Sequence, residues 1–73
     1  MAQTNSLTKS EIIQEFETMR SFELNARDLY TRIAARSDLE PQKIRTAFTS
    51  LAADEQRHAD LVQDIIDIVA NAL

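Results

Sequence analysis

Two long apolar repeats, separated by the only proline of a chain without glycine, constrain the fold most strongly. In each repeat the apolar residues alternate in steps of four and three, which is the period of one face of an α-helix. The first repeat runs from Ile12 to Ile33 and the second from Ile44 to Val69. Because neither repeat contains a helix breaker, the sequence predicts two long helices and no strands.

Local signals place the ends of these helices. Thr8 followed by Glu11 has the spacing of a capping box, which opens a helix. Pro41 suits the first turn of a second helix and disfavours helical geometry at the preceding residue. The predicted boundaries are those of a single domain over 1–73, with a disordered segment at 1–7 and helices at about 8–36 and 41–72. The short connection makes the helices antiparallel neighbours, so we expect an all-α helical hairpin.

The small size of the chain points to a further stabilising element. A chain of 73 residues rarely buries enough apolar surface to fold alone. It has no cysteine, which excludes disulfides and thiolate metal sites and leaves oligomerisation or a metal bound by nitrogen and oxygen. Additional apolar residues widen the stripe on each helix beyond what one partner helix covers. They are Ile13, Phe22, Leu29, Ala47, Ala52, Leu61, Ile66 and Ala70. We therefore expect two hairpins to dimerise into a four-helix bundle.

The charge pattern excludes several classes of partner. The formal net charge is −4 and the lysines and arginines are scattered, which argues against nucleic acid and acidic membranes. Asp60, Asp64 and Asp67 interrupt the most apolar stretch, so no segment offers the ~20 apolar residues of a membrane-spanning helix. Residues 1–7 lack the pattern of a signal peptide. We expect a cytoplasmic protein whose main partner is a second copy of itself.

Three polar residues interrupt the apolar repeats: Glu23 in the first, and Glu55 and His58 in the second. Burying such groups without partners costs several kcal/mol. Glu55 and His58 share one helix face at spacing i, i+3, and Glu23 should lie within ~3 Å of the height of Glu55. Two hairpins would supply four carboxylates and two imidazoles, which is the ligand set of carboxylate-bridged di-iron and di-manganese bundles. This donor set suits iron or manganese.

Other interpretations of these residues remain open. A single Glu23 is more often a boundary residue that reaches solvent or pairs with Arg27 one turn on. Glu55 and His58 can also form a polar pair that sets the register of a non-enzymatic helical dimerisation or scaffold module. Tyr30 lies two turns from Glu23, ~10 Å along the axis, so it is a core aromatic rather than a direct ligand.

Two segments carry a family resemblance. The segment 22–30 resembles the Glu-x-x-Ala-Arg-x-x-Tyr element of rubrerythrin-like, ferritin-like di-iron proteins, and 53–59 resembles their Glu-x-x-His element. Rubrerythrins have four helices in one chain, whereas this sequence predicts two. In size it is closest to the encapsulated ferritins, whose two-helix chains complete the iron site only between subunits. The resemblance therefore implies a ferritin-like four-helix bundle built from two chains.

The resemblance also implies roles for individual residues. Glu23, Glu55 and His58 would be the iron ligands and catalytic residues, with two ions at each dimer interface. Tyr30 would donate a hydrogen bond near the site, and Asp54 would orient a histidine ring. Ligating imidazoles generally need such an acceptor.

The activity implied by the resemblance is that of a ferroxidase. Such a protein oxidises Fe(II) with dioxygen or peroxide at a site shared between two chains, in iron storage or detoxification. A rubrerythrin-like peroxidase is the alternative, although no cysteine is present for a rubredoxin-like iron centre. The resemblance also implies an encapsulating protein shell as a partner, and hence a location in the cytoplasm or in a protein nanocompartment.

Overall fold

The computed structural model describes residues 7–36, 38 and 40–72. The predicted disorder at 1–7 falls outside these residues, apart from Leu7, which is exposed and precedes the first helix. Within the described part of the chain, neither helix is long and apolar enough to cross a membrane.

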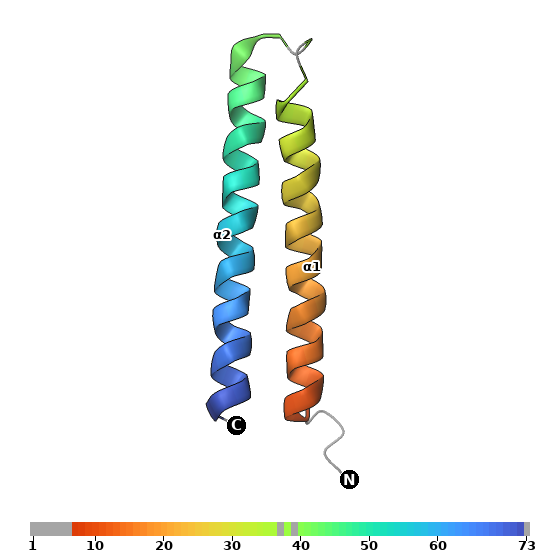
Figure 1. The fold of residues 1–73 in the computed structure, drawn as a ribbon, viewed down its shortest axis with the longest axis vertical. Helices are drawn as coiled ribbons and strands as arrows, with labels where there is room; N and C mark the ends of the chain where they lie inside the picture. The colour runs from red at the N-terminus through yellow and green to blue at the C-terminus, as the bar shows by residue number, and fades with distance from the viewer. Residues whose placement is uncertain (1–6, 37, 39, 73) are drawn as a thin grey trace.

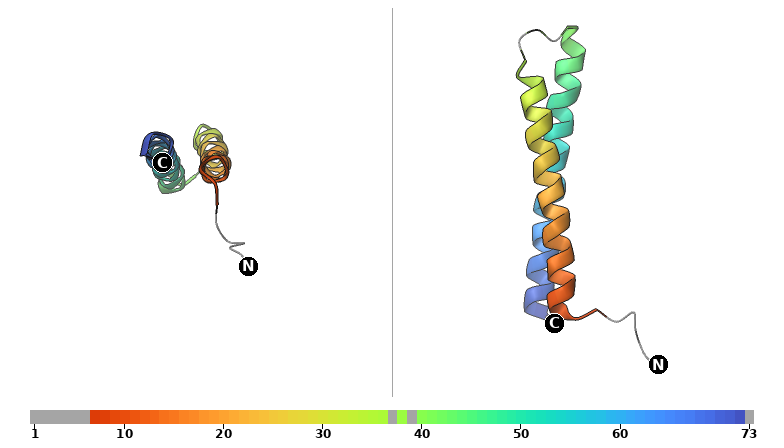
Figure 2. Two further views of the ribbon diagram at one scale, coloured as in Figure 1. Left: turned by 90° about the horizontal axis from the view of Figure 1, so that it is seen from below. Right: turned by 90° about the vertical axis from the view of Figure 1, so that its right-hand side faces the viewer.

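The chain forms a hairpin of two antiparallel helices (Figure 1). Helix α1 spans Lys9–Ala34 and helix α2 spans Gln42–Ala72. The two helices lie side by side along their whole length and contact each other extensively (Figure 2). The described residues contain no strand, and the predicted all-α hairpin is confirmed.

Side chains form hydrogen bonds at the start of α1 and at the turn that follows its end. The capping box predicted at its start is present: Glu11 N donates to Thr8 Oγ1 at 3.1 Å, and Thr8 N donates to Glu11 Oε1 at 2.9 Å. At the turn, Arg45 Nη2 of α2 donates to the Arg36 carbonyl oxygen at 2.9 Å. Arg36 itself pairs with Asp38 at 2.6 Å. These bonds satisfy polar groups at the helix ends and connect the turn to α2.

The core of the hairpin is centred on α2, where four apolar side chains are buried: Ala52, Ala59, Val62 and Ile66. Ala59 is only 1% exposed, and its small side chain lets α1 approach closely. Among these four, only Val62 belongs to the apolar repeat of α2. The contact between the helices is therefore rotated away from the predicted repeat, toward Ala52 and Ile66, which the sequence placed beside it, and toward Ala59, which the sequence did not single out.

Much of the predicted repeat remains exposed in the single hairpin. The exposed large apolar residues of the two helices are Met19, Phe22, Leu29, Ile44, Leu51, Leu61, Ile65 and Ile68. This agrees with the expectation that the apolar stripe is wider than one partner helix covers. A soluble monomer rarely exposes so many apolar side chains on two helices.

Candidate metal centre

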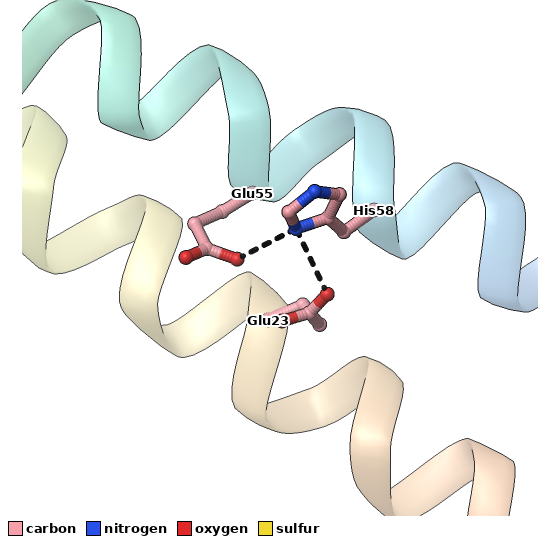
Figure 3. A group of neighbouring side chains, drawn as sticks. All are labelled: Glu23, Glu55 and His58. Atoms are coloured by element: carbon pink, nitrogen blue, oxygen red, sulfur yellow. Dashed lines mark ion pairs between the residues drawn. The ribbon is translucent and has the colours of Figure 1, made fainter.

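Three side chains meet between the middles of the two helices (Figure 3). Glu23 comes from α1, and Glu55 and His58 come from consecutive turns of α2. His58 Nδ1 lies 3.4 Å from Glu23 Oε2 and 3.4 Å from Glu55 Oε1. One potential ligand atom from each residue lies within 4.8 Å of the others. The structure thus brings together the three residues that the sequence singled out, at matching heights along the helices.

The cluster is half-buried and its charges are poorly compensated. The side chains of Glu55 and Glu23 are 20% and 25% exposed, whereas that of His58 is 47% exposed. Glu55 Oε1 is buried and accepts no hydrogen bond from the described residues. Burial raises the pKa of Glu23, the neighbouring Glu55 carboxylate raises it further, and the nearby His58 lowers it. A buried carboxylate oxygen that has no hydrogen-bond partner and lies beside a second carboxylate is a favourable position for a bound cation.

The donors fit a first-row divalent metal ion. Oxygen and nitrogen ligands bind such ions at about 2.0–2.2 Å, so two neighbouring ligands of one ion lie roughly 3 Å apart. The observed separations of 3.4 Å are close to this value. Two carboxylates with one imidazole match iron or manganese better than a metal that prefers thiolates. Glu23, Glu55 and His58 would therefore hold the ion.

A polar network next to the cluster links the two helices. The sequence allowed an ion pair between Arg27 and Glu23. In the structure Arg27 instead forms an ion pair with Asp28 at 2.6 Å. Its Nη1 also donates to Gln56 Oε1 on α2, and Gln56 Nε2 donates to Asp60 Oδ1 at 3.0 Å. The sequence pattern does not single out Gln56, which lies next to Glu55 and connects α2 to Arg27 of α1. With Arg27 engaged elsewhere, His58 is the basic residue that lies next to the Glu23 carboxylate.

The two residues expected to support the ligands make other contacts in the single hairpin. The Tyr30 ring packs against Phe48, with centroids 6.0 Å apart and planes tilted by 44°. Asp54 Oδ1 pairs with Arg57 Nη1 at 3.1 Å, one turn along α2. A supporting role for Tyr30 or Asp54 therefore stays a prediction.

Comparison with known proteins identifies the family. Neither a search of curated proteins nor a search of solved structures finds a match to this chain. A protein-family model described as Rubrerythrin matches residues 11–72, which include both helices almost entirely and all three clustered residues. Rubrerythrins are di-iron carboxylate proteins, in agreement with the carboxylate and imidazole donors of the cluster. The chain therefore belongs to the rubrerythrin family.

Proposed function

We propose that this chain is a di-iron carboxylate protein with ferroxidase activity, whose site is shared between two copies of the hairpin. The observation that carries this proposal is the Glu23, Glu55 and His58 cluster, in which an orphaned carboxylate oxygen lies beside a second carboxylate and an imidazole. Membership of the rubrerythrin family supports iron as the metal.

One hairpin supplies only half of the ligands that a di-iron bundle uses. The usual set is a glutamate from each of two helices and a Glu-x-x-His pair from each of the other two. Each hairpin has one glutamate on α1, Glu23, and one such pair on α2, Glu55 and His58. A second hairpin would complete the set. The exposure of His58 and of the apolar side chains on the same helices supports a partner at this place.

The protein residues give this site its charge balance. Four carboxylates from two chains neutralise two ferrous ions, and the carboxylates stabilise the additional positive charge of the ferric product. The raised pKa of Glu23 means that its carboxylate binds a proton more tightly than a free glutamate does, and a bound ion would compete with that proton. The half-buried position of the carboxylates strengthens these charge interactions relative to those in water.

Ferrous iron is the substrate in this proposal. Two ferrous ions lose one electron each, and dioxygen takes up both electrons and two protons to form hydrogen peroxide. With peroxide as the oxidant, the same two electrons and two protons give two water molecules. Manganese binding and a peroxidase activity stay alternatives, because the donor set alone does not fix the metal or the oxidant. A cytoplasmic location and a protein shell as partner are additional proposals. The location follows from the sequence pattern together with the resemblance, and the shell follows from the resemblance alone.

Anaerobic loading followed by oxygen tests the activity. The metal-free protein is incubated with Fe(II) without oxygen, and Fe(III) absorbance is followed after oxygen is admitted. We expect stoichiometric binding and oxidation faster than that of free Fe(II), and loss of both in Glu55→Gln, whose amide supplies no charge. Lys43→Ala, an exposed change in the first turn of α2, is the matched control and should behave like the wild type. Absence of binding and of oxidation in the wild type would leave the helical scaffold module as the function.

A further inference from the structure

His58 and Gln56 lie on the two sides of the buried face of α2. Each residue turns an α-helix by about 100°, so Gln56 stands about 160° from His58 around the helix. The four buried side chains of α2 lie within the arc between these two positions. In order from His58 to Gln56 they are Val62, Ile66, Ala59 and Ala52. One polar residue therefore borders each side of the contact with α1.

Each of these two bordering residues contacts α1. His58 Nδ1 lies 3.4 Å from Glu23 Oε2, and Gln56 Oε1 accepts a hydrogen bond from Arg27 Nη1. The arginine is itself held in place, because its Nε and Nη2 both donate to Asp28 Oδ1, at 2.8 and 2.6 Å. Outside the metal cluster, the Arg27–Gln56 bond is the only hydrogen bond between side chains of the two helices in the described part of the chain.

The apolar pattern of α2 does not by itself hold the helix in this rotation. On the His58 side, apolar residues continue beyond the contact with α1. Leu51 and Ile65 lie within about 20° of His58 around the helix, and their exposed fractions are 42% and 39%. On the other side, the helix becomes polar beyond Gln56, where the exposed Asp60 follows.

Burial of apolar surface alone favours a roll of α2 that brings the two exposed apolar side chains against α1. This roll would carry Gln56 away from Arg27 and break their hydrogen bond. The same motion would shift His58 relative to Glu23, and the two side chains would lose the spacing of 3.4 Å that suits one ion. The Arg27–Gln56 bond opposes the roll from the far side of the contact.

The bond also opposes sliding of one helix along the other. Arg27 follows Glu23 by four residues and Gln56 precedes His58 by two, so in antiparallel helices both steps run toward the turn. The steps correspond to about 6 Å along α1 and about 3 Å along α2, a difference that the long arginine side chain spans. A slide in either direction would strain this bond and separate Glu23 from His58.

We propose that Arg27 and Gln56 are positioning residues of the metal centre, whose hydrogen bond holds the rotation and the height at which the three side chains of the cluster meet. The cluster itself contains neither residue. Partners of this kind, which orient ligands without binding the ion, typically affect metal affinity strongly. The role belongs to the metal-free hairpin, and it rests on the proposed function only where iron affinity is the measured quantity.

Gln63 offers a matched control for Gln56. Both are half-buried glutamines of α2, and each donates from Nε2 to the aspartate four residues on, Asp60 or Asp67, at 3.0 Å. Among the hydrogen bonds of the described residues, Gln56 alone of the two also reaches α1. The variants Gln56→Ala and Gln63→Ala therefore lose the same contact within α2 and differ in the bond between the helices.

The single histidine of the chain reports on the cluster without metal. Nuclear magnetic resonance of the untagged full-length protein in a chelator detects the ring signals of this one imidazole. We expect one sharp set of signals in the wild type and in Gln63→Ala. In Gln56→Ala they should be broadened or doubled, because α2 then samples more than one rotation. Arg27→Gln should have the same effect, whereas Gln56→Glu, which keeps an acceptor oxygen for Arg27, should retain the sharp signals.

Iron affinity distinguishes positioning from a simple effect of charge. Loss of the Arg27 charge would, by electrostatics alone, strengthen the binding of a cation at Glu23. If the bond positions the ligands, Arg27→Gln should instead bind Fe(II) about tenfold more weakly under anaerobic conditions, and so should Gln56→Ala. The double variant should bind no more weakly than either single variant, because both changes remove the same bond. Circular dichroism checks that every variant remains helical.

Two results would overturn the positioning role. One is a set of ring signals in Gln56→Ala that matches that of Gln63→Ala, and the other is an Fe(II) affinity that rises in Arg27→Gln. A wild-type protein that binds no Fe(II) would overturn the proposed function instead, and the ring signals would still decide the role of the Arg27–Gln56 bond.

Discussion

His58 Nδ1 on α2 lies 3.4 Å from Glu23 Oε2 on α1, between the middles of the two helices. The two residues are far apart in the sequence, so their contact depends on the relative height of the helices. Glu55 Oε1 lies at the same distance from His58 and has no hydrogen-bond partner among the described residues. This arrangement of donors makes the cluster a candidate metal centre rather than an ordinary surface ion pair.

Removal of the imidazole should abolish iron oxidation without unfolding the hairpin. His58 is nearly half exposed and has no role in the buried core, so His58→Ala should retain its helical circular dichroism. Iron oxidation measured after anaerobic loading should fall to the rate of free Fe(II), because the only imidazole of the cluster is lost. Unchanged oxidation kinetics in this variant would exclude His58 as an essential ligand.

Neutralisation of Glu23 should stabilise the metal-free protein at neutral pH. The pKa of Glu23 is raised above its ordinary value of 4.5 by burial and by Glu55. Its contribution to stability is therefore fully present below pH 4.5 and is lost as the pH rises through the folded-state pKa. In the presence of a metal chelator, the Glu23→Gln variant should have a higher melting temperature than the wild type at pH 7. This difference in melting temperature should disappear below pH 4.5.

The matched control for this pH dependence is Glu17→Gln, an exposed change on the same helix, which should leave the melting temperature nearly unchanged at both pH values. A Glu23→Gln variant that is less stable than the wild type at neutral pH without metal would contradict the charge strain inferred for the empty cluster.

A charge at the exposed apolar position Leu51 should prevent dimerisation and iron binding together. Leu51 is exposed in the single hairpin, so Leu51→Arg should still form helices. In a dimer it would bury an unpaired charge, which is strongly unfavourable. Sedimentation should show a monomer, and iron binding should be weaker than in the wild type. Thr49→Arg is the control, because Thr49 lies nine residues from His58 and hence on the opposite side of α2.

A larger side chain at the buried position Ala59 should disturb the metal cluster. Ala59 is buried beside His58, and Ala59→Leu would overpack this contact at a cost of about 1–3 kcal/mol. Separation of the helices would also move Glu23 away from Glu55. Chemical denaturation should therefore show lower stability, and iron titration lower affinity. Ala53→Leu, at an exposed position on α2, should change neither quantity.

The helices and the cluster could be predicted from local signals in the sequence. The capping box of Thr8 and Glu11, the position of Pro41 and the unbroken apolar period determine where helices are possible. Because helical rise is constant, counting from the turn was enough to place Glu23 opposite Glu55.

The rotation of the helices about their axes could not be predicted in the same way. When the apolar stripe is wider than one neighbour covers, several of its faces suit the first partner equally well. The hairpin uses Ala52 and Ala59, whose small side chains permit close approach, and leaves Leu51 and Ile65 exposed. The partner of Arg27 was also undetermined, because a long side chain can reach several acceptors within one helical turn.

We propose that one hairpin holds half of an iron site and that a second copy completes it. Sedimentation velocity of the wild-type protein under anaerobic conditions, with increasing Fe(II) and with iron measured in each fraction, tests this shared site. We predict that iron sediments with a two-chain species, or with a multiple of it, at one ion per chain. A monomer that binds iron, or a monomer that persists with and without iron, would exclude a site shared between two chains.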